Sequence, residues 1–243
     1  MLCHERSTKI FPILLPGQPI LQQVHQNPYL GVLLSNDHKW APHIAKITGK
    51  ASATLGLLKR NLKQTPEHCR KTAYVSLIRP TLEYASSVWD PYYNKDITKL
   101  EQLQRKAVRF IVGDYTSQHD GFITGKMEEL NLQSLKERRR TIRLVLLFKV
   151  VSGLVPAIDI TQYLTPQRSR RRVKPAIYKD YVVLNLIDKQ VVNNSKCFKV
   201  PTGNTEQFNN SFFVRTVADW NQLDNNIVTS KTVTQFKQAL QPD

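Results

Sequence analysis

The feature that most constrains the fold is the spacing of apolar residues, which changes after residue 40 to steps of three and four. Between Ala41 and about Leu62, isoleucine, alanine and leucine recur at this spacing, which predicts an amphipathic helix. Helical spacing returns in five later segments, at residues 65–90, 94–112, 134–152, 211–223 and 232–240. The sequence therefore predicts a mainly α-helical fold.

Residues that cap or stop helices mark several boundaries. Thr65 is expected to be an N-cap, because Pro66 and Glu67 after it suit the first turn of a helix. Ser134 opens the pattern Ser-Leu-Lys-Glu, which resembles a capping box. Gly113 fits the position just after the C-terminus of the preceding helix.

The segment SLIRPTLEYASSVWDPY combines a proline break, the carboxylate of Glu83, three aromatic residues and a Trp-Asp-Pro stop. Proline removes a backbone donor, so Arg79-Pro80 predicts a kink or a break. Glu83 is a helical neighbour of Arg79 and is expected to pair with it. Tyr84 and Trp89 are expected to lie in the core. The segment is interpreted as structural and not catalytic.

The start of the chain differs from the rest, because short apolar runs there are bounded by proline and glycine and predict a short β-hairpin. After residue 165 the chain becomes basic and turn-prone, and no internal repeat is present. The predicted organisation is a β-hairpin remnant, a thumb-like helical bundle, a helical region, a basic linker with weak strands or disorder, and C-terminal helices, at residues 1–36, 37–115, 116–165, 166–210 and 211–243.

Charge indicates the class of partner. The chain has 35 lysine and arginine residues against 19 acidic ones, a formal net charge of +16. Such a surplus attracts polyanions, so nucleic acid is the first candidate and an anionic membrane surface the second. A merely basic domain is the plain alternative. The residues expected to contact phosphate are Lys59, Arg60, Lys99, Arg105, Lys106, Arg109, Arg138, Arg139, Arg143, Arg168, Arg170, Arg171 and Arg172.

Other patterns bear on location. The run from Arg168 to Arg172 also fits a nuclear localisation patch. No apolar run approaches the ~18 residues of a spanning helix, and charged residues near the N-terminus argue against a signal peptide. Cys3, Cys69 and Cys197 are odd in number and far apart, which indicates reduced thiols. We therefore expect an intracellular protein without a membrane partner.

Motifs for catalysis are absent from the sequence. The six histidines and the cysteines do not form a metal-binding spacing, and no nucleophile elbow, P-loop or dinucleotide-binding turn occurs. Glu128-Glu129 is the one adjacent carboxylate pair, and we interpret it as solvated charge. The sequence predicts no catalytic residue, no metal site and no cofactor in this chain.

Five segments, in a fixed order from Tyr29 onward, resemble the C-terminal third of reverse transcriptases of non-LTR (LINE-type, jockey-like) retrotransposons. They are YLGVLLSNDHKWAPHI, KASATLGLLKRNL, AYVSLIRPTLEYASSVWDPY, KLEQLQRKAVRFIVGDY and SFFVRTVADWNQL. The resemblance implies that the helices from Pro42 to about Val112 form a thumb that holds the template–primer duplex. It also implies a primer-grip-like strand pair at Tyr29, Leu30, Gly31 and Val32, and a structural signature at Arg79, Pro80, Glu83, Tyr84, Trp89 and Trp220.

The chain departs from this family at the catalytic centre. A reverse transcriptase needs an aspartate pair and a third aspartate to hold two Mg²⁺ ions, and this sequence has no adjacent aspartates. The resemblance therefore implies a fragment that is not an enzyme and needs no cofactor, while the parent enzyme would use Mg²⁺. Such a fragment is expected to bind the backbone of an RNA–DNA hybrid or a DNA duplex. The alternatives are a helical protein-interaction module and a non-functional transposon remnant, and the oligomeric state is open.

Overall fold

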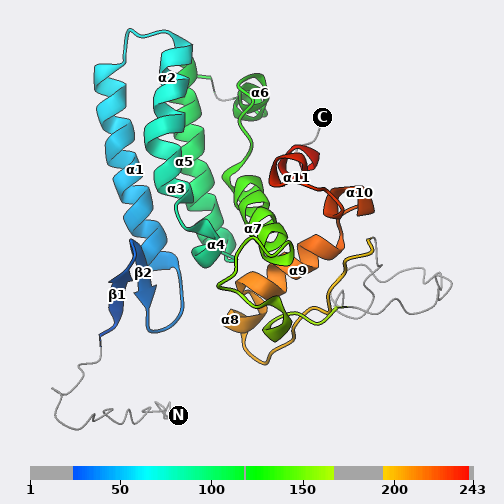
Figure 1. Cartoon of the computed structure of the whole chain (residues 1–243). Helices are drawn as coiled ribbons and strands as arrows, with labels where there is room; N and C mark the ends of the chain where they lie inside the picture. Colours follow the sequence, from blue (N-terminus) through cyan, green and yellow to red (C-terminus); the bar gives the residue numbers. More distant parts are fainter. Residues whose placement is uncertain (1–23, 118, 167–193, 241–243) are drawn as a thin grey trace, which may run out of the picture. The chain divides into compact units, whose positions relative to one another are not determined.

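The computed structural model describes residues 24–117, 119–166 and 194–240 (Figure 1). The chain divides into two compact units, with the boundary after His43, and each unit is described separately. Helices dominate the described residues, and their strands form one two-stranded sheet, which confirms the mainly α-helical prediction. The strands expected before residue 24 and most of the basic linker lie outside the described residues.

The first unit contains the predicted β-hairpin. Strands β1 (Gln26–Tyr29) and β2 (Val32–Ser35) are antiparallel, and Tyr29 is paired with Val32 at the turn. The two turn residues have positive φ angles, 46° at Leu30 and 84° at Gly31. Positive φ at both central residues characterises a type I′ turn, whose twist matches that of the flanking strands. Glycine adopts this conformation without a steric cost.

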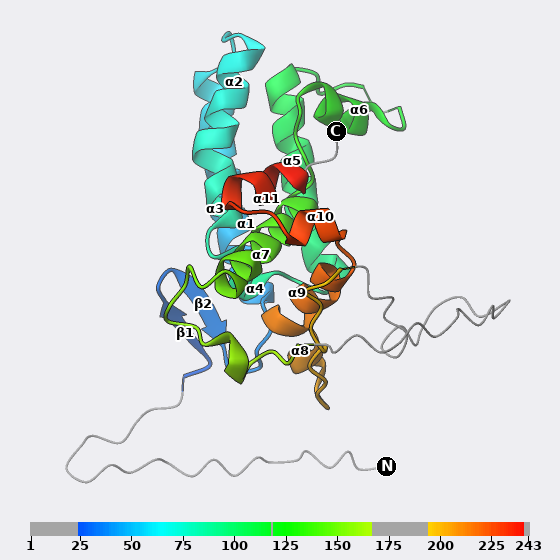
Figure 2. The same cartoon turned by 45° about the vertical axis from the view of Figure 1, so that its right-hand side comes forward.

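The second unit begins with three long helical segments that run alongside one another (Figures 1 and 2). These are α1 (Ala41–Asn61), of which residues 44–61 belong to this unit, the α2–α3 segment and α5 (Asn94–Val112). The α2–α3 segment comprises α2 (Glu67–Ala73), the π-helix η1 (Tyr74–Ile78) and α3 (Arg79–Glu83). The apolar stripe predicted for α1 is buried in full, at Ile44, Ile47, Ala51, Leu55 and Leu58.

Of the kink or break predicted at Arg79-Pro80, the break is wrong. The helix continues through Pro80, and the π-helix η1 precedes it. There the Arg79 N–H donates to the Tyr74 carbonyl, a five-residue step. A π turn is one way in which a helix accommodates a residue without an N–H. The helix ends later, at Tyr84 and Ala85, where Ala85 has a φ of 52°.

Helix ends follow the capping predictions with one exception. The Ser134 hydroxyl accepts a hydrogen bond from the Glu137 N–H at 3.1 Å, and Gly113 ends α5 with a φ of 84°. The prediction of an N-cap at Thr65 is wrong, because its hydroxyl donates to the Leu62 carbonyl at 2.9 Å. Thr65 therefore satisfies an acceptor at the end of α1 instead of a donor at the start of α2.

The rest of the second unit is built around α7 (Leu135–Val151), which packs against α4, α5, α9 and α11. The shorter helices are α4 (Ser86–Trp89), α6 (Phe122–Glu129), η2 (Ile160–Gln162), α8 (Glu206–Asn209), α9 (Phe212–Asn221), α10 (Asn225–Val228) and α11 (Val233–Ala239). The helices from residue 44 onward belong to one compact unit, in which α7 packs against both α5 and α9.

The second half of α7 forms a hydrophobic core with the C-terminal helices. Phe148 stacks on Phe236 of α11 with ring centroids 4.4 Å apart, and Trp220 of α9 lies 5.7 Å from the same ring. The buried members of this core are Leu144, Val145, Leu147, Phe148, Leu164, Phe198, Val217, Trp220, Leu223, Val228 and Phe236. Most of the second half of α7 is therefore buried.

No helix among the described residues is both long enough and apolar enough to cross a membrane.

Candidate nucleic-acid interface

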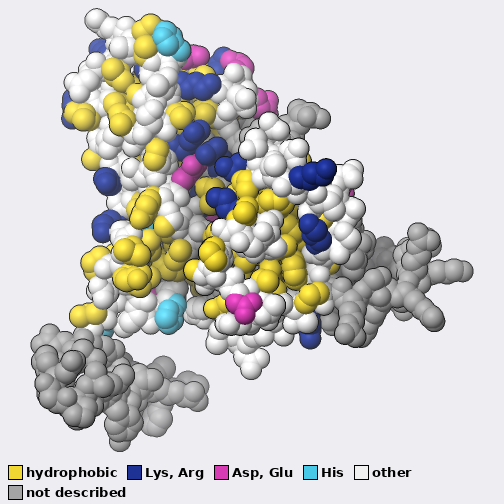
Figure 3. All heavy atoms as spheres, in the orientation of Figure 1, with side chains coloured by type: hydrophobic (Ala, Val, Ile, Leu, Met, Phe, Trp, Pro, Cys, Tyr) yellow, Lys and Arg dark blue, Asp and Glu magenta, His cyan; other side chains and the backbone are white. Residues whose placement is uncertain are grey.

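Lysine and arginine side chains are spread over the face of the molecule shown in Figure 3, so positive charge alone does not mark one site. Two lysines come together near the C-terminal ends of α1 and α5. The pKa of Lys59 is lowered, first by partial burial of its ammonium group and then by the positive charge of Lys106. The two ammonium groups are therefore close enough to repel each other.

An aromatic residue partly compensates this repulsion. The Lys59 Nζ lies 4.9 Å from the centroid of the Tyr115 ring, within the range of a cation–π interaction. Tyr115 belongs to the loop after α5 and is itself exposed. Tyr115 could not be identified from the sequence, because nothing in the local pattern places its ring beside a lysine of α1.

Two arginines extend the positive charge at this end of α5. The Arg109 guanidinium lies 5.7 Å from the centroid of the Phe122 ring. Arg70 packs against Gly113, where an added Cβ would lie 2.9 Å from its Nη1. A cation at this position suits the negative end of the helix dipole. Arg70 and Phe122 were not predicted as site residues, since their contacts depend on tertiary packing.

We define the α1–α5 basic cluster by helix position, as Lys59 and Arg60 in the last turn of α1 and Arg105, Lys106 and Arg109 in the last two turns of α5. Within residues 24–117, 119–166 and 194–240, no acidic side chain forms a salt bridge with any of these five. Lys99, also predicted, lies on α5 and is 3.9 Å from Asp96. The cluster is therefore a surface with positive charge that the described residues leave without a counter-ion.

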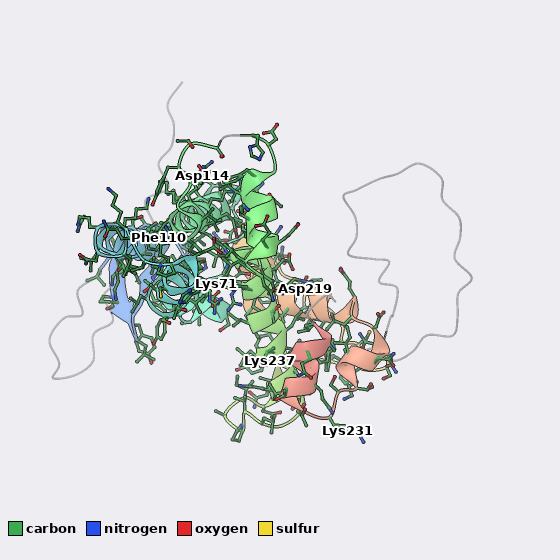
Figure 4. All side chains as sticks on the ribbon, turned by 90° about the horizontal axis from the view of Figure 1, so that it is seen from above. Lys71, Phe110, Asp114, Asp219, Lys231 and Lys237 are labelled. Atoms are coloured by element: carbon green, nitrogen blue, oxygen red, sulfur yellow. The ribbon has the colours of Figure 1, made fainter. Side chains whose placement is uncertain are left out.

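The nearest loop also carries a carboxylate, Asp114 (Figure 4). Its oxygens accept hydrogen bonds from the hydroxyl and backbone N–H groups of Thr116 and Ser117. These bonds hold the pKa of Asp114 below its usual range, the Ser117 hydroxyl contributing most. The Asp114 carboxylate is thus hydrogen-bonded within its own turn. In α6, the Lys126 ammonium group forms a salt bridge with the Glu129 carboxylate at 2.6 Å.

Two arginines in the first half of α7, which the sequence predicted as phosphate contacts, are not exposed. Arg139 is fully buried, and Arg143 is nearly so. The Arg139 Nε donates to the Asp90 carboxylate at 2.8 Å, and the Arg143 guanidinium lies 2.9 Å from Asp90 and 3.0 Å from Asp219. Because aspartates of other segments hold them, these two residues are not available to phosphate.

Arg138 is also engaged. Its guanidinium forms a two-pronged ion pair with Glu83, with Nη2 donating to Oε2 at 2.9 Å. This hydrogen bonding raises the pKa of Arg138. The prediction that Glu83 pairs with Arg79 is therefore wrong, since the partner comes from α7 instead of the next helical turn.

Asp90, which the sequence analysis did not identify as a pairing residue, joins three elements of the second unit. Its carboxylate contacts Arg139 and Arg143 of α7, and Arg215 of α9 at 3.1 Å. The Arg215 Nη1 also donates to the Asp90 carbonyl at 2.8 Å. We call these four residues the Asp90 network.

The signature residues divide into buried and exposed sets. Trp89 and Trp220 are fully buried, and the Trp89 indole N–H donates to the Tyr84 carbonyl at 2.8 Å. The prediction of a core position is wrong for Tyr84, whose side chain is 59% exposed, because the chain turns away after α3. Pro80 is exposed and Arg79 half-buried.

The primer-grip-like residues lie in the first unit, at the hairpin turn. Tyr29 is 63% exposed and Leu30 is exposed, whereas Val32 is buried. Their role in gripping a primer stays a prediction. The basic run at Arg168, Arg170, Arg171 and Arg172 lies outside the described residues.

The described residues contain no group of three or more histidine, cysteine or acidic side chains that could hold a metal ion. Comparison with family models, with curated proteins and with solved structures yields no significant match.

Substituting Lys106 with glutamine is expected to raise the pKa of Lys59, because it removes the repulsion between the two ammonium groups. The pKa should stay below that of an ordinary lysine, since partial burial, the larger cause, remains. An NMR titration of the lysine side-chain Cε signals measures the change. Substituting Lys95, exposed at the start of α5, is the control and should leave Lys59 unchanged. An unaltered Lys59 pKa in K106Q would show that the two lysines are not coupled.

Proposed function

We propose that this chain is a fragment of a non-LTR retrotransposon reverse transcriptase that binds the backbone of an RNA–DNA hybrid or a DNA duplex. The observation that carries the proposal is the α1–α5 basic cluster, in which Lys59 and Lys106 repel each other without an acidic partner among the described residues. A phosphate beside both ammonium groups would relieve that repulsion. The ligand implied is a polyanion recognised by its charge.

Binding through such a cluster is independent of base sequence. Lysine and arginine side chains neutralise phosphates and release the counter-ions that condense on the nucleic acid. Contacts to phosphate position the duplex and carry no direct sequence information. Tyr115 adds an exposed aromatic ring next to Lys59, suited to packing against a sugar or an unpaired base.

The family assignment within this proposal is supported by the five segments that resemble the palm end and thumb of these enzymes, in their order along the chain. The sequence has no adjacent aspartate pair, so the Mg²⁺-dependent polymerisation of the parent enzyme is not proposed for it. A nucleic-acid ligand implies a location inside the cell, and the nucleus is included in the proposal.

The experiment that tests the proposal is a salt titration of binding. Fluorescence anisotropy would measure the affinity of the full chain for labelled RNA–DNA and DNA duplexes of about 20 base pairs. If the five residues of the cluster each contact one phosphate, the slope of log K against log salt is expected to be about −4.5, at −0.9 per contact. An affinity that hardly changes with salt would rule out phosphate contact as the mode of binding.

A further inference from the structure

A groove on the second unit runs along one face of α7. It has a volume of about 480 Å³, and α7 supplies most of its lining, together with α4 and α11. The apolar residues that line it are Ile142, Val145 and Leu146, of which Val145 is buried and Ile142 and Leu146 are half-buried. With Arg138 and Lys149 they form a stripe at helical spacing on α7. In Figure 3, hydrophobic side chains gather on this part of the surface, with lysine and arginine around them.

The rim of the groove is positively charged. Arg138 lies at one end of the stripe and Lys149 at the other, about three helical turns away. Lys237 adds a third cation from α11, which crosses α7 in Figure 4. No carboxylate is among the described residues that line the groove. Arg138 is balanced by Glu83, whereas Lys149 and Lys237 form no salt bridge within the described residues.

We propose that this groove binds an acidic amphipathic helix of a partner protein. The apolar floor, from Ile142 to Leu146, is about one turn long and fits neighbouring apolar anchors of such a helix, such as those at i, i+3 and i+4. The lysines on the rim complement carboxylates beside those anchors. The groove and the α1–α5 basic cluster are built from different residues, so this inference stands whether or not the chain binds nucleic acid.

Charge and polarity favour this occupant over two others. A second copy of the chain would bring a second set of cations to the same rim, and like charges across an interface are unfavourable. A nucleic-acid backbone would satisfy the rim but would leave the apolar side chains of Ile142 and Leu146 without a matching surface. A helix with leucine on one face and glutamate beside it satisfies both the floor and the rim.

The test uses the full chain and a fluorescein-labelled helical peptide of about 14 residues, with leucine on one face and glutamate at both ends. A matched peptide carries lysine in place of glutamate. Anisotropy titration is expected to show that the acidic peptide binds at least about tenfold more tightly than the basic one. Equal affinity for the two peptides would overturn the proposal.

Variants then locate the binding site. Reversing the rim with Lys149→Glu and Lys237→Glu is expected to lower the affinity for the acidic peptide by at least about tenfold. Leu146→Glu tests the floor with the same expectation. The matched controls are Lys136→Glu, on the exposed start of α7, and Leu154→Glu, whose side chain is 59% exposed outside the groove. Peptide binding that survives both the rim and the floor variants would overturn the assignment.

A DNA duplex in the same assay separates this site from the proposed nucleic-acid surface. The rim variants should bind the duplex as the unmodified chain does, because the α1–α5 basic cluster is intact in them. If the rim variants lose the duplex and keep the peptide, the groove is a nucleic-acid site and the proposal fails.

Discussion

Replacing Asp90 with asparagine is expected to lower the free energy of unfolding by about 3–5 kcal/mol, the usual cost of removing one partner from a buried ion pair. The carboxylate lies within 3.1 Å of guanidinium nitrogens of Arg139, Arg143 and Arg215. Asparagine keeps the shape of aspartate but removes the negative charge. Arg139 and Arg143 would then lose a shared counter-ion at buried positions, where water screens charge weakly, and Arg215 would lose one at a partly exposed position.

Arg139 makes this substitution especially costly. Its side chain is fully buried, and its Nη1 and Nη2 have no hydrogen-bond partner among the described residues. Asp90 is therefore the acidic partner that the described residues provide for this guanidinium. A charge buried without a partner is one of the few causes of very large destabilisation by a single substitution.

Urea unfolding followed by circular dichroism would measure the effect. Asp120→Asn is the matched control, because Asp120 is exposed and forms no salt bridge with the described residues, and its effect should stay within about 0.5 kcal/mol. A loss below about 1 kcal/mol for D90N would mean that the Asp90 network is not a buried ion cluster in solution. Because Asp90 joins α7 and α9, unfolding of D90N should show early loss of the C-terminal helices.

The helices could be predicted because helical spacing is a local property of the sequence. Ile44, Ala51 and Leu55 recur at steps that put them on one face of α1, and the folded chain buries that face. The Ser134 cap depends on residues three positions apart and was predictable for the same reason. The hairpin follows from short apolar runs around Leu30-Gly31.

Side-chain partners could not be predicted, because they come from distant parts of the chain. Arg139 appears in a run of arginines that suggests exposure, yet its partner Asp90 lies 49 residues earlier. Arg143 reaches Asp219, 76 residues later. Asp90 itself stands before a proline and resembles a helix stop. For the same reason, the sequence could propose Lys59 and Lys106 for the interface but not their proximity or the Tyr115 ring.

Neutralising three exposed residues of the α1–α5 basic cluster, Arg60, Arg105 and Lys106, with glutamine is expected to weaken duplex binding on the order of 100-fold at 0.1 M salt. The salt slope should become shallower by about 2.7, at 0.9 for each lost phosphate contact. These three side chains are exposed, so substituting them leaves the contacts of Lys59 with Tyr115 and of Arg109 with Phe122 in place. Anisotropy titration at several salt concentrations measures both quantities.

The matched control removes the same number of charges elsewhere, at the exposed residues Lys136, Lys199 and Lys231. Both triple variants carry a formal net charge of +13, which is the +16 of the chain less three. If the cluster binds phosphate, the control should keep its affinity within about threefold and its salt slope unchanged, because screening confines charge effects to about 10 Å. Equal losses in the two variants would mean that binding follows the overall charge, and the assignment to α1 and α5 would fail. The cluster variant should still bind the acidic peptide, because none of the three substituted residues lines the groove on α7.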